Sequence, residues 1–221
     1  MLTEGLFHRA FESGDAGCWQ ELLDATRATA FGLAELHQCG CTYGEQVTWD
    51  HELETLRAKH DKLAAAVPSL RDHTGPALER IQAAAARAPA DPFVPTHHSF
   101  RPAQVLLRDD GVSFIDFDKF CLAEAGSDIA VLTTKLLYMG VNKVGAPVGG
   151  RAADRDVRLA ELRTAFLHEY GRHAVASVDR VALWEALELF SLVLSAAKKA
   201  HGPRVESCAL MLQHHLSEHG L

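Results

Sequence analysis

The stretch from Pro95 to Ala130 reads PTHHSFRPAQVLLRDDGVSFIDFDKFCLAEAGSDIA and decides the expected fold. Two short apolar runs, residues 104–107 and 112–117, flank the turn sequence RDDG. The Asp-Gly pair supplies the positive φ that a tight hairpin turn needs. The sequence therefore predicts a small β-hairpin whose open end brings two polar clusters together.

These polar clusters lie just outside the two predicted strands. His97, His98 and Ser99 precede the first strand, and Asp116 and Asp118 end the second. Two carboxylates that leave an apolar strand need a cation or water as a partner. We therefore expect a polar site at the open end of the hairpin.

The order and spacing of these residues resemble the catalytic region of the aminoglycoside phosphotransferase and choline kinase family, which is similar in fold to protein kinases. The family pattern is His-Gly-Asp, four residues, Asn, a strand, Ile-Asp-Phe-Asp and, about ten residues later, Asp-Leu-Ala opening a helix. The matching segments here are HHSFRPAQ, IDFD and SDIA, at residues 97–104, 115–118 and 127–130. The resemblance implies Mg²⁺- and ATP-dependent phosphoryl transfer to a hydroxyl of a small molecule.

The resemblance also implies a role for each matching residue. His97 would organise the catalytic loop, Asp116 would hold Mg²⁺ on the ATP phosphates, and Asp128 would brace the loop. Gln104 falls on the family's metal-binding Asn, and its amide oxygen can ligate a hard cation from a stem one methylene longer. Ser99 falls on the catalytic Asp, and a neutral hydroxyl cannot replace a carboxylate that orients and deprotonates an alcohol. We therefore expect transfer to be weak or lost.

Two functions remain open from the sequence. In the first, a small-molecule kinase, Asp116 and Gln104 would hold Mg²⁺·ATP while Ser99 or a neighbouring histidine contacts the acceptor hydroxyl. Either His97 or His98 could supply the base, since neutral imidazole titrates near the working pH. The second function is a non-catalytic, pseudokinase-like binding or regulatory module.

Helical periodicity dominates the rest of the chain. The pattern predicts helices over residues 16–39, 48–67, 74–87, 128–139, 154–170, 178–200 and 203–219. Residues 1–15 show no clear periodicity and are expected to be a lead-in, and the Gly- and Pro-rich residues 140–150 are expected to be a loop. The expected fold is mainly α (α+β), a single domain over residues 1–221 with one small β-hairpin.

The resemblance covers one lobe of a kinase-like fold. Kinase-like enzymes also carry an amino-terminal β-sheet lobe with a phosphate-covering loop and a strand Lys paired to a helix Glu. A sheet of about five strands at ~5 residues each needs far more chain than the residues before Ala16. We therefore expect the carboxy-terminal lobe alone, as a fragment or a natural short form. An active enzyme would need an amino lobe from a partner chain or a homodimer.

Composition and patterning exclude several classes of protein. The 22 basic residues are scattered among 29 acidic ones, for a net charge of -7, so no nucleic-acid partner is expected. The longest apolar run, residues 181–197, is interrupted by Glu185 and Glu188 and is shorter than a bilayer span of ~20 residues. Five cysteines without framework spacing, and no signal pattern at the amino terminus, predict a cytoplasmic protein with reduced thiols.

Two further clusters contain residue types that ligate metals. His37, Cys39 and Cys41 form a His-x-Cys-x-Cys pattern, but no second ligand pair follows at finger-like spacing. His214 and His215 are adjacent, and adjacent side chains diverge in direction. We expect ordinary thiols at the first cluster and an exposed helix end at the second.

Overall fold

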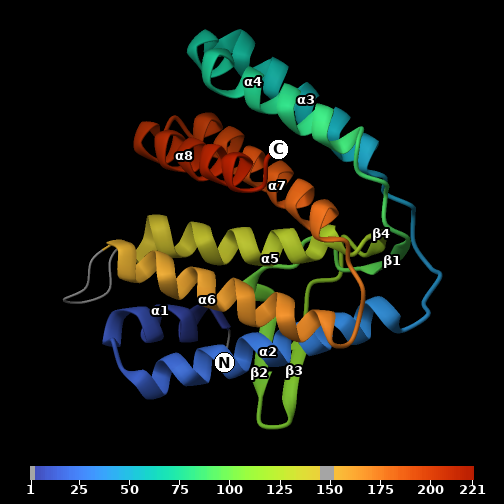
Figure 1. Cartoon of the computed structure of the whole chain (residues 1–221), viewed down its shortest axis with the longest axis vertical. Coiled ribbons are helices and arrows are strands. Elements are labelled where there is room, and N and C mark those ends of the chain that lie inside the picture. The colour runs from blue at the N-terminus through green and yellow to red at the C-terminus, as the bar shows by residue number, and fades with distance from the viewer. Residues whose placement is uncertain (1–2, 145–151) are drawn as a thin grey trace.

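Figure 1 shows the computed structural model, which describes residues 3–144 and 152–221. Helices dominate, as the sequence predicts. The α-helices are α1 (Thr3–Ser13), α2 (Ala16–Gln38), α3 (Trp49–Ala66), α4 (Pro68–Ala85), α5 (Gly126–Met139), α6 (Ala152–Gly171), α7 (Val178–Lys198) and α8 (Gly202–Glu218). The strands are β1 (Phe93–Thr96), β2 (Val105–Arg108), β3 (Gly111–Phe114) and β4 (Cys121–Glu124). No helix of this described part is long and apolar enough to cross a membrane.

The predicted hairpin is present as β2 and β3. The two strands are antiparallel, with Val105 opposite Phe114 and Arg108 opposite Gly111. Gly111 has a φ of 142°, a conformation that favours glycine, so the turn uses the residue that predicted it. The second strand is shorter than expected, because it ends at Phe114 and leaves Asp116 outside the sheet.

A second two-stranded sheet, β1 with β4, corrects the expectation of a single hairpin. Phe93 lies opposite Glu124 and Thr96 opposite Cys121 in an antiparallel register. Local pattern did not predict this pairing, because the partners are far apart in sequence and Pro95 interrupts the first strand. The pairing of β1 with β4 brings the two ends of the polar segment 97–120 together. This segment therefore starts and ends at the same small sheet.

Helix α1 corrects the expectation of a lead-in at the amino terminus. Leu6, Phe7, Ala10 and Phe11 are buried, and α1 packs on α2. The Phe7 and Phe11 rings stack with centroids 4.5 Å apart. The helix was missed because its apolar face is only two turns long and lies beside glycines.

Other boundaries differ from the expected ones by smaller amounts. Helix α4 begins at Pro68 rather than residue 74, with the proline in the first turn, where its missing N–H is not needed. In the segment expected to be a loop, Gly140–Val144 form a π-helical turn after α5, and residues 145–150 lie outside the described residues.

The helices form two cores that meet at α5. One core joins α1, α2 and α6 with the β2–β3 hairpin, and the other joins α3, α4, α7 and α8. Figure 1 shows α5 between these groups, with its first turn beside β1 and β4. Since α5 contributes buried residues to both cores, it fixes the position of the loop that its first turn contacts.

A buried ion pair anchors α7 to β4. The Arg180 guanidinium donates to both carboxylate oxygens of Glu124, from Nε at 2.6 Å and from Nη2 at 2.5 Å. Arg180 also lies 4.9 Å from the ring centroid of Trp49 in α3. The pair therefore links three elements around the polar loop.

Candidate active site

Asp128, in the first turn of α5, braces the loop that follows β1. Its Oδ2 accepts a hydrogen bond from the backbone N–H of His97, and its Oδ1 accepts one from His98, both at 2.7 Å. Ala125 occupies the N-cap of α5, and the fully buried Asp128 carboxylate faces the loop. This is the bracing role that the resemblance implies.

Two further side chains, His37 and Tyr170, hold the Asp128 carboxylate in place. His37, at the end of α2, donates from Nε2 to Oδ2 of Asp128 at 3.2 Å. Its Nδ1 then accepts a hydrogen bond from the Tyr170 hydroxyl at 2.8 Å. Burial raises the pKa of Tyr170, which keeps that hydroxyl protonated. The three side chains form a buried chain of hydrogen bonds that connects α2, α5 and α6 beside the loop.

Gln104 connects the two positions where the resemblance expects catalysis and metal binding. Its Nε2 donates to Asp116 Oδ2 at 2.6 Å and to Ser99 Oγ at 3.2 Å. Its Oε1 accepts the backbone N–H of Arg101 at 3.0 Å, which fixes the orientation of the amide because an N–H needs an acceptor. The structure thus brings Ser99, Gln104 and Asp116 together, with the amide nitrogen rather than its oxygen facing Asp116.

Asp116 is held in an uncommon backbone conformation at the surface. Its φ is 69°, a left-handed value that few residues other than glycine adopt, and its carboxylate is 46% exposed. Non-glycine residues in this region cluster at functional sites. Arg101 Nη2 lies 3.7 Å from Oδ2, and none of the described residues donates a hydrogen bond to Oδ1.

The side chains fit a magnesium ion unequally. Mg²⁺ takes oxygen ligands and usually keeps several waters. Asp116 fits, because Oδ1 is open on an exposed carboxylate. In this arrangement the Gln104 oxygen does not fit, because Arg101 occupies it. Asp116 is therefore the residue that would contact the ion here, and Gln104 would have to turn to add a second ligand.

His97 is buried and holds the loop to the hairpin. Its ring Nε2 donates to the backbone carbonyl of Ile115 at 2.9 Å, while its backbone N–H is bound by Asp128. The His97 and Phe117 rings lie 4.6 Å apart. A fully buried ring in this position suits an organising role and cannot reach an acceptor in solvent.

His98 points away from the loop toward α3. Its Nε2 lies 3.4 Å from Glu52 Oε1, and its φ is 58°. Burial lowers its pKa, but the neighbouring Cys121 and Glu52 outweigh burial and raise the pKa to about 10. At neutral pH the ring therefore carries its proton, and a protonated imidazole has no lone pair with which to deprotonate an alcohol.

Three residues of this site were not predicted from the sequence. Arg101 was not singled out, although a basic residue two positions after Ser99 was a usable signal. His37 was considered as part of the His-x-Cys-x-Cys pattern and not as a partner of Asp128. Glu52 gave no signal, because it lies on α3 and only the fold brings it to His98.

A pocket of about 420 Å³ opens beside the same loop. Arg101 lies on its wall together with residues of α5, α7 and the start of α8. Its basic lining residues are Arg101, Lys135, Lys199, His201 and Arg204. Lys135 Nζ lies 2.7 Å from Glu188 Oε1, so its charge is paired. The positive charge of the pocket wall therefore comes from the other basic residues.

Solved structures that this chain resembles in fold include small-molecule kinases. A glucosamine kinase in complex with glucosamine, ADP and inorganic phosphate superposes with a TM-score of 0.72 at 16% identity, over 96% of this chain and 56% of that one. A choline/ethanolamine kinase family protein from Mesorhizobium loti gives a TM-score of 0.59 at 14% identity, over 91% and 68% of the two chains. An ethanolamine kinase from Plasmodium vivax gives 0.58 at 12% identity, over 89% and 60%.

These likenesses show a kinase-like fold, and the chain spans a little over half the length of the glucosamine kinase. No curated protein sequence matches the chain. A family model described as the phosphotransferase enzyme family matches residues 13–190, which include the braced loop, Gln104 and Asp116. The chain therefore belongs to the phosphotransferase enzyme family.

Proposed function

We propose that the chain holds Mg²⁺·ATP at Asp116 and a small-molecule hydroxyl at Ser99, as a phosphotransferase whose transfer step is slow. The observation that carries this proposal is the Gln104 amide, which hydrogen-bonds to both residues at once. The loop that carries Ser99 is fixed by Asp128, so the spacing of the two positions is set by buried contacts.

Asp116 and Arg101 supply the electrostatics of the proposed reaction. When bound, Mg²⁺ would neutralise charge on the phosphates, and the open Oδ1 of Asp116 would hold it. The Arg101 guanidinium, 3.7 Å from the same carboxylate, is placed to stabilise negative charge that develops on a transferred phosphoryl group. Asp116 and Arg101 are thus the groups of this chain that would face the phosphates.

Ser99 orients the acceptor hydroxyl but cannot take its proton. Its Oγ already accepts a hydrogen bond from Gln104, which leaves the Ser99 O–H to donate to the acceptor oxygen. His98 is protonated at neutral pH and His97 is buried, so neither histidine replaces the missing carboxylate. General base catalysis contributes about 10²–10⁴-fold to a rate, and we expect a loss of that order.

The acceptor and the rest of the nucleotide site are part of the same proposal. The relatives of this fold include kinases for glucosamine, choline and ethanolamine, so small hydroxyl compounds are the acceptor class. An amino lobe supplied by a partner chain or a second copy would cover the ATP beside Asp116, where Ile115 and Phe117 are about 40% exposed. We place the protein in the cytoplasm, where ATP is present and its five free cysteines stay reduced.

A radiolabelled ATP assay with Ser99→Asp tests the proposal. The acceptors are glucosamine, choline, ethanolamine and an anionic hydroxy acid, the last because Arg101, Lys199 and Arg204 line the pocket. We expect Ser99→Asp to raise the transfer rate by about 10²–10⁴-fold. Ser99→Asn is the matched control, because it has the same shape without the charge and should give no gain.

The alternative is a non-catalytic module that keeps the lobe and performs no transfer. The engaged oxygen of Gln104 favours it, because that residue then offers the metal no ligand. Magnesium-dependent ATP binding without any gain from Ser99→Asp would support a nucleotide-binding module. Absence of ATP binding by the folded chain would support a module that binds another partner.

A further inference from the structure

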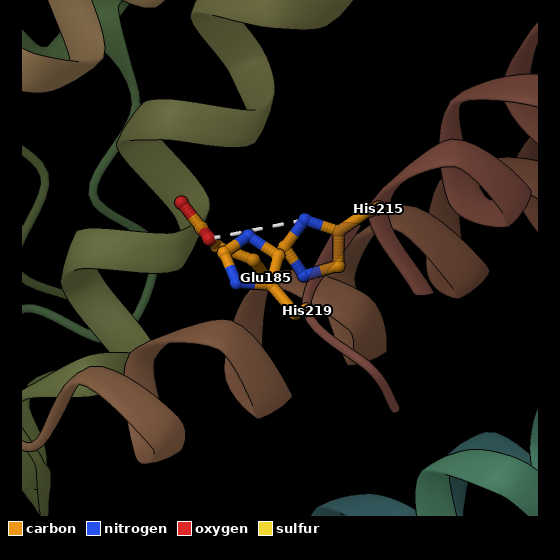
Figure 2. Close-up of side chains that lie close together, drawn as sticks. All are labelled: Glu185, His215 and His219. Atoms are coloured by element: carbon orange, nitrogen blue, oxygen red, sulfur yellow. Dashed lines mark ion pairs between the residues drawn. The ribbon is translucent and has the colours of Figure 1, made fainter. Parts of the chain in front are cut away.

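A cluster of three metal-ligating side chains lies between α7 and the end of α8, on elements that do not carry Asp116. Glu185, His215 and His219 each offer a ligand atom, and these atoms lie within 4.8 Å of one another. Figure 2 shows the two imidazole rings side by side, facing the Glu185 carboxylate. The sequence predicted an exposed helix end here, and His214 is exposed, but His215 is buried.

The tautomer of His215 leaves one ring nitrogen available. Its Nε2 lies 2.8 Å from the backbone carbonyl oxygen of Ala182, and a carbonyl can only accept, so Nε2 carries a proton. In a neutral ring Nδ1 then has a free lone pair, and this atom faces Glu185 Oε2 at 4.0 Å. A metal-binding histidine commonly donates its other N–H to a backbone carbonyl in this way.

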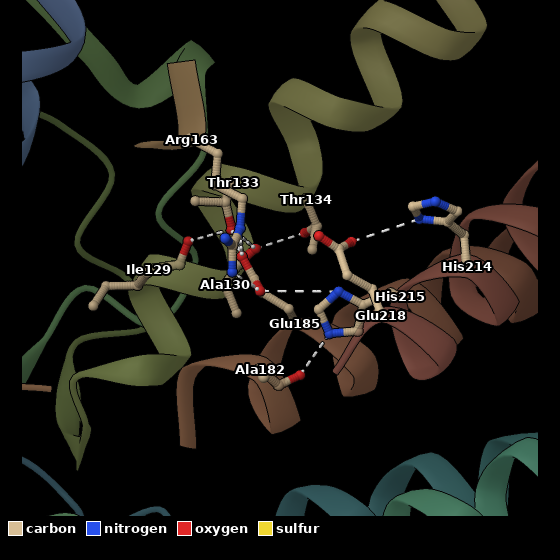
Figure 3. Close-up of polar contacts among 10 residues, drawn as sticks. All are labelled: Ile129, Ala130, Thr133, Thr134, Arg163, Ala182, Glu185, His214, His215 and Glu218. Carbon is tan, nitrogen blue, oxygen red and sulfur yellow. Dashed lines mark hydrogen bonds and ion pairs between the residues drawn. The ribbon is translucent and has the colours of Figure 1, made fainter. Parts of the chain in front are cut away.

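Glu185 Oε2, the oxygen that faces His215, accepts fewer hydrogen bonds from the described residues than Oε1 does (Figure 3). Oε1 accepts from Thr133 Oγ1 at 2.7 Å and from Arg163 Nε at 2.9 Å. Among the described residues, Arg163 alone donates to Oε2, from Nη2 at 2.7 Å. Because a carboxylate has about four acceptor positions, the unfilled one is on Oε2, the oxygen nearest to His215.

The spacing of the two histidines supports a shared ligand. His215 lies in the last turn of α8, and His219, four residues later, is the C-cap residue whose backbone N–H bonds to the His215 carbonyl, so the two side chains lie on the same face. Their ring centroids are 4.4 Å apart. Two ligands at ~2.0–2.1 Å from a tetrahedral Zn²⁺ lie ~3.4 Å apart, so small side-chain rotations would bring the three atoms to one ion.

A simple ion pair explains these contacts less well. Glu185 already has a cationic partner in Arg163, which binds both of its oxygens. An ion pair between Glu185 and His215 would also involve only two of the three clustered side chains.

We propose that Glu185, His215 and His219 bind one Zn²⁺ that fastens the end of α8 to α7. Two imidazoles and one carboxylate are a common zinc ligand set, and the fourth position is open to water beside the half-buried His219. Arg163 and Thr133 hold the carboxylate from the other side, as outer partners of a metal site do. The ion would thus lock α8 without taking part in phosphoryl transfer.

Calorimetry and thermal unfolding of the full chain, stripped with EDTA and then titrated with ZnCl₂, test the proposal. We expect one ion per chain and a rise in Tm of about 5–10 °C at ~100-fold excess of free Zn²⁺ over Kd. His219→Gln should weaken binding by more than the ~10–100-fold that loss of an outer partner costs. Because His219 is half-buried, this change is less disruptive than one at Glu185 or His215.

His214→Gln is the matched control, because this neighbouring side chain is exposed and outside the cluster. It should bind Zn²⁺ like the wild type. X-ray absorption of the zinc complex should show nitrogen and oxygen ligands at ~2.0–2.1 Å. The proposal is overturned by no binding, by equal binding in wild type and His219→Gln, or by a Zn–S distance of ~2.3 Å, which would place the ion at cysteines.

Discussion

Gln104 Nε2 lies 2.6 Å from Asp116 Oδ2, so the amide of Gln104 donates a hydrogen bond to the carboxylate that we propose holds the metal. The N–H of Arg101 fixes this orientation by occupying the other end of the amide. Hydrogen bonds within the protein therefore connect the two side chains that a metal ion would otherwise bridge. Its stability should depend on Gln104 even without magnesium.

Gln104→Ala should lower the free energy of unfolding by about 1–3 kcal/mol, because it removes the hydrogen bonds that the buried Gln104 amide makes to Ser99, Arg101 and Asp116. Urea unfolding followed by circular dichroism measures the change. Gln20→Ala is the control, because Gln20 is exposed on α2 and bonds only to Asp24. Equal effects of the two changes would show that Gln104 does not hold the loop.

Asp128→Asn should destabilise the chain by about 2–3 kcal/mol, because an amide N–H₂ would face backbone N–H groups that need an acceptor. It should also lower amide protection at His97 and His98 in hydrogen exchange, since Asp128 binds both N–H groups. Asp110→Asn on the exposed hairpin turn should change neither quantity. Unchanged protection at the loop in Asp128→Asn would contradict the bracing role.

Arg180→Met should cost about 3–5 kcal/mol, because it leaves the fully buried Glu124 carboxylate unpaired. A Glu124→Leu and Arg180→Met double variant should be more stable than Arg180→Met alone, since it removes both charges. Guanidinium denaturation of the three proteins gives the comparison. A double variant less stable than the single one would show that packing rather than the unpaired charge decides the loss.

The contribution of His98 to stability should depend on pH. Its folded pKa of about 10 is above the unfolded value of about 6.5. A raised pKa contributes stability that is complete below the unfolded pKa and is lost as pH rises through the folded pKa. The difference in unfolding free energy between wild type and His98→Asn should therefore shrink from pH 6.5 to pH 10. Asn tolerates the positive φ of this position, so the comparison isolates the charge. A constant difference would contradict the protonated state.

The part of the fold that local signals encode was predicted from the sequence. The Asp109-Asp110-Gly111 turn encodes the hairpin, and helical periodicity encodes α2, α3 and α5 to α8. The pairing of β1 with β4 was missed because it depends on residues distant in sequence. The short apolar face of α1 was missed because it becomes clear only against α2.

The residues of the candidate site were identified by spacing, but their orientations were not. The sequence placed Gln104 beside Asp116, whereas only the position of the Arg101 N–H decides which end of the amide faces the carboxylate. The same limit applies to His214 and His215. Adjacent residues on α8 face different directions, and packing against α7 decides which one is buried.

Magnesium-dependent ATP binding to the full chain, measured by calorimetry, tests most directly whether Asp116 holds the metal on the nucleotide. We expect weak binding that requires Mg²⁺, is lost in Asp116→Asn and persists in Asp118→Asn, because Asp118 is another exposed carboxylate two residues further along. No binding by the folded wild type, or equal binding by the two variants, would contradict the proposed metal site.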